Sequence, residues 1–247
     1  MKISIIIATY NAEEHLESCL LSIVNSTVDI GKIEVIIIDG GSTDNTINII
    51  KKNSSLISYY CSEKDNGIYD AWNKGIQQAT TDWIMFLGAD DQLKPLAIDN
   101  YLKLIENSNL DYISAKINLL DSNNKTIRVI GKKYDWKVFK HYMNVAHVAS
   151  LHRKKIFEKF GLYDTEYKIC GDYELLLRVK NNLKCYFLDQ VVANMRIGGV
   201  SHLSYPSLLE TKKAKIKNKS VSPIIAELDY IFAVVKLSIK KMIKFNK

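Results

Sequence analysis

The stretch Trp83-Ile84-Met85-Phe86-Leu87-Gly88-Ala89-Asp90-Asp91 decides the fold that we expect for this chain. It begins with a continuous apolar run, which is typical of a strand buried on both faces of a sheet. The run ends at two carboxylates, Asp90 and Asp91, which would lie at the carboxyl end of that strand. Ligands bind at this edge of open α/β sheets, and paired carboxylates suit a hard divalent cation. Alternatively, this polar turn caps the next helix, and Pro95 marks the start of that helix.

Strand-like and helix-like segments alternate through the first half of the chain. Strands are expected at 3–8, 33–38 and 57–61, and helices at 12–26, 45–52 and 68–79. This alternation predicts parallel strands joined by right-handed crossovers. The polar turns that follow the strands should then gather along one edge of the sheet as a candidate site. They are Thr9-Tyr10-Asn11, residues 39–44, residues 65–67 and Asp90-Asp91.

The second half of the chain is less regular. Helices are expected at 96–106 and 172–181, and extended segments at 112–120, 126–130, 147–152 and 183–197. We expect one domain over 1–205 and a helical tail over 206–247. Within the tail, apolar residues recur at helical spacing from 223 onward, and Lys236, Lys240, Lys244 and Lys247 fall on the opposite side.

This basic amphipathic helix has two interpretations. It is either docked on the protein's own core with its lysines in water, or it contacts a membrane surface or a second copy of the chain. The membrane interpretation is favoured, because the apolar stripe is long and the lysines cluster toward the chain end.

Composition limits the partners and the compartment. The net charge of +7 favours anionic ligands or surfaces, and the absence of a basic-aromatic motif argues against nucleic acid. No apolar stretch approaches the ~20 residues of a membrane span, and no secretory signal is evident. The four cysteines form no close metal-type pair, so we expect reduced thiols in a cytoplasmic protein.

Two common phosphate-binding motifs are missing. A dinucleotide-binding Rossmann domain carries Gly-x-Gly-x-x-Gly after its first strand, but here that turn is Ala8-Thr9-Tyr10-Asn11-Ala12. The Gly-Lys-Ser/Thr sequence of a P-loop is also missing. Carboxylates with a metal ion remain as the candidates for holding a phosphorylated ligand.

Four blocks then make the chain recognisable. They are Ile7-Ala8-Thr9-Tyr10-Asn11-Ala12-Glu13, Ile38-Asp39-Gly40-Gly41-Ser42-Thr43-Asp44-Asn45-Thr46, Asp65-Asn66-Gly67-Ile68-Tyr69-Asp70-Ala71-Trp72-Asn73-Lys74-Gly75-Ile76 and Phe86-Leu87-Gly88-Ala89-Asp90-Asp91. With these blocks in order, the chain resembles a family-two inverting glycosyltransferase of the bacterial polysaccharide-biosynthesis type. The resemblance is tight over residues 1–95, continues loosely through 171–178 and excludes the tail. It implies the α/β GT-A fold, with a Rossmann-like, mostly parallel sheet covered by helices on both faces. The C-terminal amphipathic helix, which is predicted from its apolar spacing, adds to this fold.

The resemblance also implies a reaction. A sugar would move from a nucleotide-diphosphate-sugar donor, expected to be a UDP-sugar, to a hydroxyl of a saccharide or polyprenyl-linked acceptor. Mn²⁺ or Mg²⁺ would bridge the donor diphosphate and stabilise its negative charge as the glycosidic bond breaks. A lipid-linked acceptor and the basic tail would place the protein at the inner face of the cell membrane.

Individual roles follow from the resemblance. Asp91 would ligate the metal and Asp172 would be the base, whereas Glu174 is a weaker candidate. His147 would contact the acceptor or the diphosphate. The nucleotide-sugar-binding residues would be Thr9, Tyr10, Asn11, Asp39, Asp65, Gly67, Asn73, Lys74 and Asp90.

Some positions leave alternatives open or depart from the family. Asp172 is also suited to be a helix N-cap. Many relatives carry a basic residue where Trp72 stands and a glutamate where Gly171 stands. Residues 198–202 are either a loop that closes over the donor or an ordinary connection.

Two other functions remain as alternatives. A sugar nucleotidyltransferase should carry a glycine-rich, basic loop after its first strand, which residues 8–12 lack. A non-catalytic nucleotide-sugar-binding protein is disfavoured by the intact Asp39, Asp90, Asp91 and Asp172.

Overall fold

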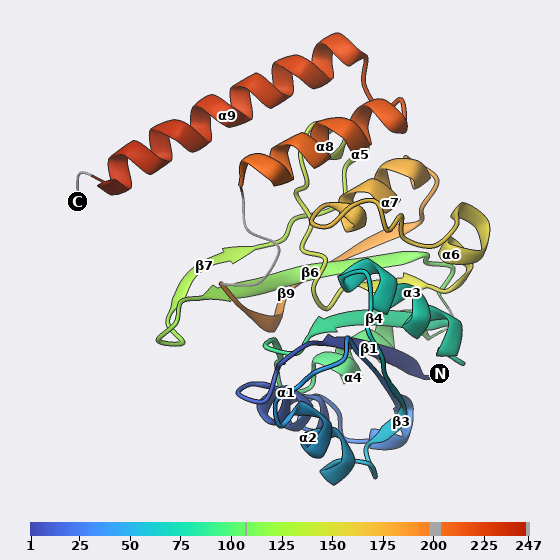
Figure 1. The fold of residues 1–247 in the computed structure, drawn as a ribbon. Coiled ribbons are helices and arrows are strands. Elements are labelled where there is room, and N and C mark those ends of the chain that lie inside the picture. The colour runs from blue at the N-terminus through green and yellow to red at the C-terminus, as the bar shows by residue number, and fades with distance from the viewer. Residues whose placement is uncertain (107, 198–203, 246–247) are drawn as a thin grey trace.

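A single mixed sheet forms the centre of the molecule (Figure 1). The computed structural model describes residues 1–106, 108–197 and 204–245. Over these residues, the sheet has nine strands in the order β3-β2-β1-β4-β8-β6-β9-β5, with β7 paired to β6. The expected loop at 198–202 lies outside the described residues.

The first half of the chain forms the parallel part of the sheet, as predicted. Its strands are β1 (Ile3–Thr9), β2 (Ile33–Asp39), β3 (Ile57–Ser62) and β4 (Trp83–Gly88). In the register of β1 with its two neighbours, Thr9 lies opposite Asp39 and Ala8 lies opposite Gly88. The carboxyl ends of β2, β1 and β4 therefore lie side by side.

Alternate residues of these strands enter two separate cores. Ile5, Ile7 and Met85 pack on one face with α1 (Leu16–Val24), α2 (Thr46–Lys52) and α4 (Ala97–Ile105). Ile6 and Phe86 pack on the other face with α3 (Ile68–Gln78), α6 (Lys155–Phe160) and α7 (Gly171–Val179). Helices thus cover both faces of the sheet, as the family resemblance implies.

The second half adds mostly antiparallel strands. These are β5 (Gln92–Leu93), β6 (Tyr112–Leu120), β7 (Thr126–Ile130), β8 (Leu151–Arg153) and β9 (Cys185–Arg196), of which β6 and β9 pair in parallel. The short helices η1 (Ile30–Lys32) and α5 (Trp136–Phe139) complete the described elements outside the tail. The expected extended segment 147–152 is a strand only at its end, because residues 147–150 form a turn in which Ala149 has a φ of 58°.

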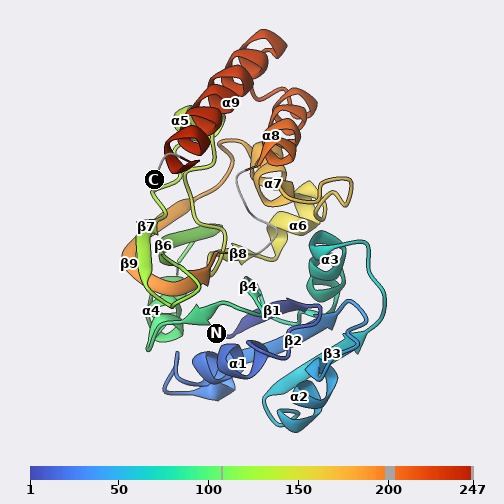
Figure 2. The ribbon, with the colours of Figure 1, turned by 60° about the vertical axis from the view of Figure 1, so that its left-hand side comes forward.

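The tail is an antiparallel pair of helices, α8 (Tyr205–Lys217) and α9 (Pro223–Phe245). The hydroxyl of Tyr205 lies 3.1 Å from Ser238 Oγ, and Lys212 forms an ion pair of 3.0 Å with Glu227. Both helices lie beyond α7, on the side of the molecule opposite α1 and α2, and the C-terminal half of α9 extends over the β6–β7 hairpin (Figure 2).

The apolar stripe of α9 faces outward. Its exposed members include Ile224, Leu228, Ile231, Val235 and Met242, of which Leu228 is 60% exposed. The interpretation in which this stripe packs on the protein's own core is therefore wrong for most of its length. Among the described helices, none is both long enough and apolar enough to cross a bilayer.

Candidate active site

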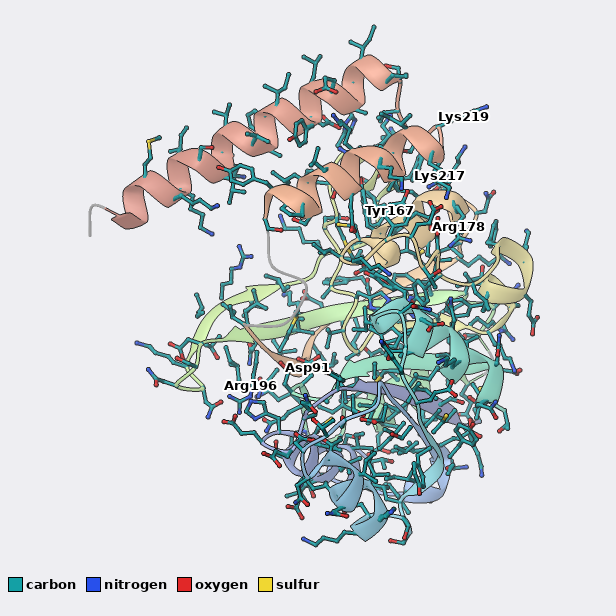
Figure 3. All side chains as sticks on the ribbon, in the orientation of Figure 1. Asp91, Tyr167, Arg178, Arg196, Lys217 and Lys219 are labelled. Carbon is teal, nitrogen blue, oxygen red and sulfur yellow. The ribbon has the colours of Figure 1, made fainter. Side chains whose placement is uncertain are left out.

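Four of the predicted site residues line one cavity of about 540 Å³ at the carboxyl end of β4. They are Asp90, Asp91, His147 and Asp172. The cavity lies between this edge of the sheet, α3, α7 and the C-terminal half of α9, and Figure 3 shows Asp91 and Arg196 in this region. Residues that are about 80 positions apart in the sequence are thus brought to a common space.

A tight reversal at residues 88–91 presents the two aspartates. The Asp91 N–H donates to the Gly88 carbonyl over 3.1 Å, and the Gly88 N–H donates to Asp91 Oδ2 over 3.0 Å. A Cβ atom on Gly88 would lie 2.7 Å from Asp91 Oδ2 and 2.9 Å from Asp90 Oδ1, so a larger residue at position 88 would displace the two carboxylates. Neither aspartate caps α4, whose N-cap is Leu96 without a side-chain hydrogen bond, so the capping interpretation of this turn is wrong.

The electrostatics of this turn favour a cation. Asp91 is buried, and burial together with the neighbouring Asp90 raises the pKa of Asp91 to about 7, against the opposing effect of the Gly88 N–H and Arg196. Within the described ranges, no three His, Cys, Asp or Glu side chains form a metal cluster. Two carboxylates alone still fit Mg²⁺ or Mn²⁺ when the remaining ligands are phosphate oxygens and water.

Asp172 lies in the first turn of α7. The N-cap of α7 is Cys170, so the interpretation of Asp172 as the N-cap is wrong. Its Oδ1 accepts a hydrogen bond from the Tyr173 N–H over 2.8 Å and lies 3.2 Å from the hydroxyl of Tyr69. Burial raises the pKa of Asp172 to about 6, and these two hydrogen bonds act in the opposite direction.

Packing explains why glycine precedes Asp172 in this chain. A Cβ atom on Gly171 would lie 2.8 Å from the ring of Tyr69. The tyrosine ring therefore fills the space that a side chain at position 171 would need, and it places the Tyr69 hydroxyl beside the carboxylate of Asp172.

Glu174 points away from the cavity. Its carboxylate is buried in an ion pair with Arg178, with Oε2 at 3.0 Å from Nε and 2.9 Å from Nη2. Arg178 also donates to the carbonyls of Phe160 and Leu162. Glu174 thus holds Arg178, which joins α7 to the C-terminal end of α6. Asp172 is left as the acidic side chain of this helix in the cavity.

Asp39 lies beneath the turn that follows β2 and is fully buried. Its carboxylate accepts hydrogen bonds from Thr9 Oγ1 at 2.9 Å, Ser62 Oγ at 2.7 Å and the Ser42 N–H at 2.9 Å. Burial acts to raise the pKa of Asp39. The hydrogen bonds from Ser42, Ser62 and Thr9 nevertheless hold this pKa below its ordinary value. Asp39 is therefore an ionised residue that joins the ends of β1, β2 and β3.

The turns after β1 and β2 are joined into one platform. Asn11 has a φ of 47°, donates its N–H to Ser42 Oγ over 2.8 Å and accepts from the Thr43 N–H over 3.0 Å. Tyr10 is 66% exposed on this platform. Because β1 lies between β2 and β4, the platform adjoins the turn of Asp90 and Asp91 without forming part of the cavity wall.

The remaining predicted donor-binding residues lie outside the cavity wall. Asp65 accepts from the Gly67 N–H over 2.9 Å within the loop before α3. Both ends of the Asn73 amide bind the backbone of Tyr163, at 2.8 and 2.9 Å. Lys74 forms an ion pair of 2.7 Å with Glu63. The structure therefore gives Asn73 and Lys74 contacts that hold the protein together.

His147 lines the cavity but is almost completely buried. Its ring stacks on Trp72 and Phe86, with centroids 4.9 and 5.4 Å apart, and its Nε2 lies 2.9 Å from the hydroxyl of Tyr163. Burial lowers the pKa of His147 to about 3, so the ring is neutral at physiological pH. The neutral His147 ring can form a hydrogen bond with a ligand, but it carries no positive charge to attract a diphosphate.

Comparison with known proteins decides the family. Residues 4–161 match the profile of glycosyl transferase family 2. The chain belongs to this family. It is 31% identical over 209 residues to a PGL/p-HBAD biosynthesis glycosyltransferase of Mycobacterium tuberculosis, covering 81% of this chain and 78% of the relative.

A second relative is named for transfer to a lipid-linked sugar phosphate. It is the dolichyl N-acetyl-alpha-D-glucosaminyl phosphate 3-beta-D-2,3-diacetamido-2,3-dideoxy-beta-D-glucuronosyltransferase of Methanococcus voltae. The identity is 29% over 213 residues, which cover 78% of this chain and 66% of the relative. The protein is thus a glycosyltransferase by sequence.

Solved structures show that the fold of this glycosyltransferase is GT-A. Residues 1–349 of Staphylococcus aureus TarS, crystallised with UDP-GlcNAc, superimpose with a TM-score of 0.74 at 16% identity, covering 95% of this chain and 72% of that one. The mannosyltransferase PcManGT of Pyrobaculum calidifontis, in complex with GDP-Man and Mn²⁺, gives a TM-score of 0.64 at 13% identity, covering 96% and 75%.

Sequence reasoning missed several cavity residues of this family 2 protein. Tyr69 falls inside the third recognised block, but its contact with Asp172 depends on a fold that brings together residues 103 positions apart. Arg196 ends β9, and its place at the end of an expected strand was a usable signal. Lys240 was expected on the polar side of the tail helix, but nothing in the pattern indicated that it and Lys241 line this cavity.

Proposed function

We propose that this protein is an inverting, metal-dependent glycosyltransferase that moves a sugar from a nucleotide-diphosphate-sugar to a hydroxyl of a saccharide or lipid-linked acceptor. The observation that carries the proposal is that Asp90, Asp91 and Asp172 line one cavity. The first two are suited to hold a cation at the diphosphate, and the third is suited to take a proton.

The donor side of the proposal rests on the turns at the ends of β1, β2 and β4. TarS is described with UDP-GlcNAc and PcManGT with GDP-Man and Mn²⁺, which supports a nucleotide-sugar donor and a divalent ion here. We expect a UDP-sugar whose nucleotide lies along the platform of Thr9, Tyr10, Asn11 and Asp39. Asp91, with Asp90 beside it, would hold Mn²⁺ or Mg²⁺, which supplies Lewis-acid stabilisation of the departing diphosphate.

Inversion requires a base on the acceptor side. The acceptor hydroxyl oxygen bonds to the anomeric carbon, the bond from that carbon to the diphosphate oxygen breaks, and the hydroxyl proton passes to Asp172. With a pKa of about 6, Asp172 is ionised at neutral pH yet basic enough to accept this proton. Tyr69 and the Tyr173 N–H orient the carboxylate from the side of Oδ1, which leaves Oδ2 for the acceptor.

The acceptor side of the proposal draws on the relatives. One of them is named for PGL/p-HBAD biosynthesis, and another for transfer to a dolichyl-linked N-acetylglucosaminyl phosphate. The second name favours a lipid-linked acceptor. Together with the exposed apolar stripe of α9, it supports work at the inner face of the cell membrane, with α9 lying on the surface.

Binding of nucleoside diphosphates tests the metal site. UDP and GDP are titrated into the protein with and without Mn²⁺, and unfolding temperature reports binding because a ligand of the folded state stabilises it. Asp91→Ala should abolish the Mn²⁺-dependent stabilisation. Asp82→Ala is the matched control, because Asp82 is an exposed aspartate at the opposite end of β4. Unchanged Mn²⁺-linked affinity in Asp91→Ala would reject the metal role.

Turnover tests the base. Asp172→Asn keeps the shape of the side chain and should bind UDP with Mn²⁺ as the wild type does, yet lose at least 10²-fold in kcat because no base remains. Near-normal transfer by this variant, measured as UDP release with a lipid-linked acceptor, would remove Asp172 from the mechanism.

A further inference from the structure

A second cavity, of about 830 Å³, opens beneath α9 and meets the first at Asp172. Both cavities are lined by Arg128, Asp172, Leu237 and Lys240. Asp90 and Asp91 line the first cavity only. Seen from the proposed metal site, the second cavity therefore lies beyond Asp172. An acceptor in the second cavity would thus meet the proposed base.

The lysine and arginine side chains of the second cavity divide into two groups. Lys212 and Lys215 are neutralised by ion pairs of 3.0 Å with Glu227 and 2.7 Å with Asp229. Arg128, Lys236 and Lys240 line the same cavity, and among the described residues no carboxylate lies within 4.0 Å of their charged groups. This group is the cationic roof of the cavity, and its charge is available to an anionic ligand.

The rest of the lining is largely apolar. Met143 and Val145 form one wall, and Phe232, Ala233 and Leu237 of α9 form part of the other. Phe232 is also 71% exposed, which makes the cavity wall continuous with the outward apolar stripe of α9. An occupant can thus have an apolar part at Phe232 and an anionic part beneath Lys236 and Lys240.

We propose that the second cavity is the acceptor site and that its occupant is a lipid phosphate carrying the acceptor sugar. Lys236, Lys240 and Arg128 would bind the phosphate, since ammonium and guanidinium groups form charge-assisted hydrogen bonds with phosphate oxygens. The lipid chain follows Phe232 to the outer face of α9. This inference rests on the proposed function, because it assigns the acceptor of the same reaction.

The arrangement also explains the orientation of α9. An amphipathic helix usually turns its apolar face to the protein. Here the polar face bearing Lys236 and Lys240 lines the cavity while the apolar stripe faces outward. One helix thus presents an apolar surface to a lipid layer and a cationic surface to the phosphate of a molecule leaving that layer.

Calorimetric titration with farnesyl phosphate, kept below its micellar concentration, tests this site. The wild type should bind it, and Lys236→Ala/Lys240→Ala should weaken binding at least tenfold. Lys236→Arg/Lys240→Arg should retain binding because the charge remains. Lys51→Ala/Lys103→Ala, which removes the same charge from exposed positions elsewhere, should bind as the wild type does.

Three further measurements identify what is recognised. Farnesol, which has no phosphate, should bind weakly and equally to the wild type and the alanine variant. Inorganic phosphate should compete only at concentrations far above those of farnesyl phosphate. Equal affinity of the wild type and the alanine variant for farnesyl phosphate would overturn the proposal, as would inorganic phosphate competing as strongly as the lipid.

Titration of UDP with Mn²⁺ into the wild type and Lys236→Ala separates this proposal from the proposed function. UDP affinity should be unchanged in Lys236→Ala, because Lys236 lines the second cavity and not the first, and a parallel loss of UDP and farnesyl phosphate binding in this variant would overturn the proposal by assigning Lys236 to the donor. The wild-type protein could instead bind farnesyl phosphate through Lys236 and Lys240 and fail to bind UDP. That result would refute the proposed function and support the lipid phosphate site.

Discussion

At the scale of single residues, two glycines set the positions of the acidic side chains in the cavity. Gly88 leaves room for the carboxylates of Asp90 and Asp91, and Gly171 leaves room for the ring of Tyr69. Neither glycine has a left-handed φ, so the requirement is steric in both places. The placement of these acidic side chains therefore depends on two positions that carry no functional group.

Gly171→Ala should impair catalysis without removing any polar group. The added methyl would lie 2.8 Å from the Tyr69 ring, which must move and carry its hydroxyl away from Asp172. We expect kcat to fall about fivefold, the equivalent of one hydrogen bond of ~1 kcal/mol, while the KM for the donor changes little. Tyr69→Phe removes only the hydroxyl and should reproduce the effect. A wild-type kcat in both variants would contradict this account.

The pH dependence of transfer should follow Asp172. Burial raises its pKa to about 6, and only the ionised form accepts a proton. With the metal saturating, kcat/KM should therefore fall tenfold per pH unit below about 6 and level off above it. Tyr69→Phe removes a hydrogen bond that favours the ionised form, so its profile should shift to higher pH. A profile that is flat down to pH 5 in the wild type would exclude Asp172 as the titrating base.

The sequence identifies the residues of this site better than it identifies their supports. Asp91 and Asp172 follow from motifs that are local in sequence. The supports of Asp172 do not, because Tyr69 reaches it through packing between α3 and α7. The donor-binding role of Asn73 stays a prediction, and the structure adds that both ends of its amide bind the backbone of Tyr163, a contact that the recognised block does not indicate.

At the scale of elements, α8 holds the segment that leads into α7. The carboxylate of Glu210 accepts hydrogen bonds from the N–H groups of Lys168, Ile169 and Cys170, at 3.0, 2.9 and 2.9 Å. Asp172 follows two residues later. The domain boundary that we expected after residue 205 stays a prediction, and truncation there would remove this support from the segment that carries Asp172.

Glu210→Ala should loosen the segment before α7. Three backbone N–H groups would lose their acceptor, and we expect the free energy of unfolding to fall by about 1–3 kcal/mol, with a lower kcat. Glu210→Gln keeps one acceptor oxygen and should have an intermediate effect. Urea denaturation measures the stabilities, and Glu227→Ala, which breaks an exposed ion pair with Lys212, is the control with an expected loss below ~1 kcal/mol. Equal losses in Glu210→Ala and Glu227→Ala would refute the role of Glu210.

The regular elements of the first half were predictable because each has a clear pattern of apolar residues. Buried parallel strands give continuous apolar runs, and α3 gives an apolar face at helical spacing. Other elements are too short to show such a pattern of apolar residues. These are the two-residue β5, the four-residue α5 and the turn before β8. Their geometry depends on partners from distant parts of the chain, such as β9 for β5.

At the scale of the whole molecule, the orientation of α9 determines which partner surface can bind its apolar stripe. The sequence predicted an apolar stripe and a basic side, but a helical pattern does not tell which side meets the protein. In the structure the stripe is exposed while Lys240 and Lys241 line the cavity. A lipid surface and a second copy of the chain are the two occupants that would cover such a stripe.

Leu228→Glu/Val235→Glu distinguishes these occupants. The two side chains are 60% and 50% exposed, so the free energy of unfolding should change little. Binding to vesicles with anionic lipids should weaken at least tenfold, because burying each apolar side chain contributes about 1.5–3 kcal/mol. Val28→Glu, at an 85% exposed position outside the tail, is the matched control and should bind vesicles as the wild type does. If sedimentation instead finds a wild-type dimer that dissociates in the double variant, with vesicle binding unaffected, the stripe joins two copies of the chain and the proposed membrane contact is wrong.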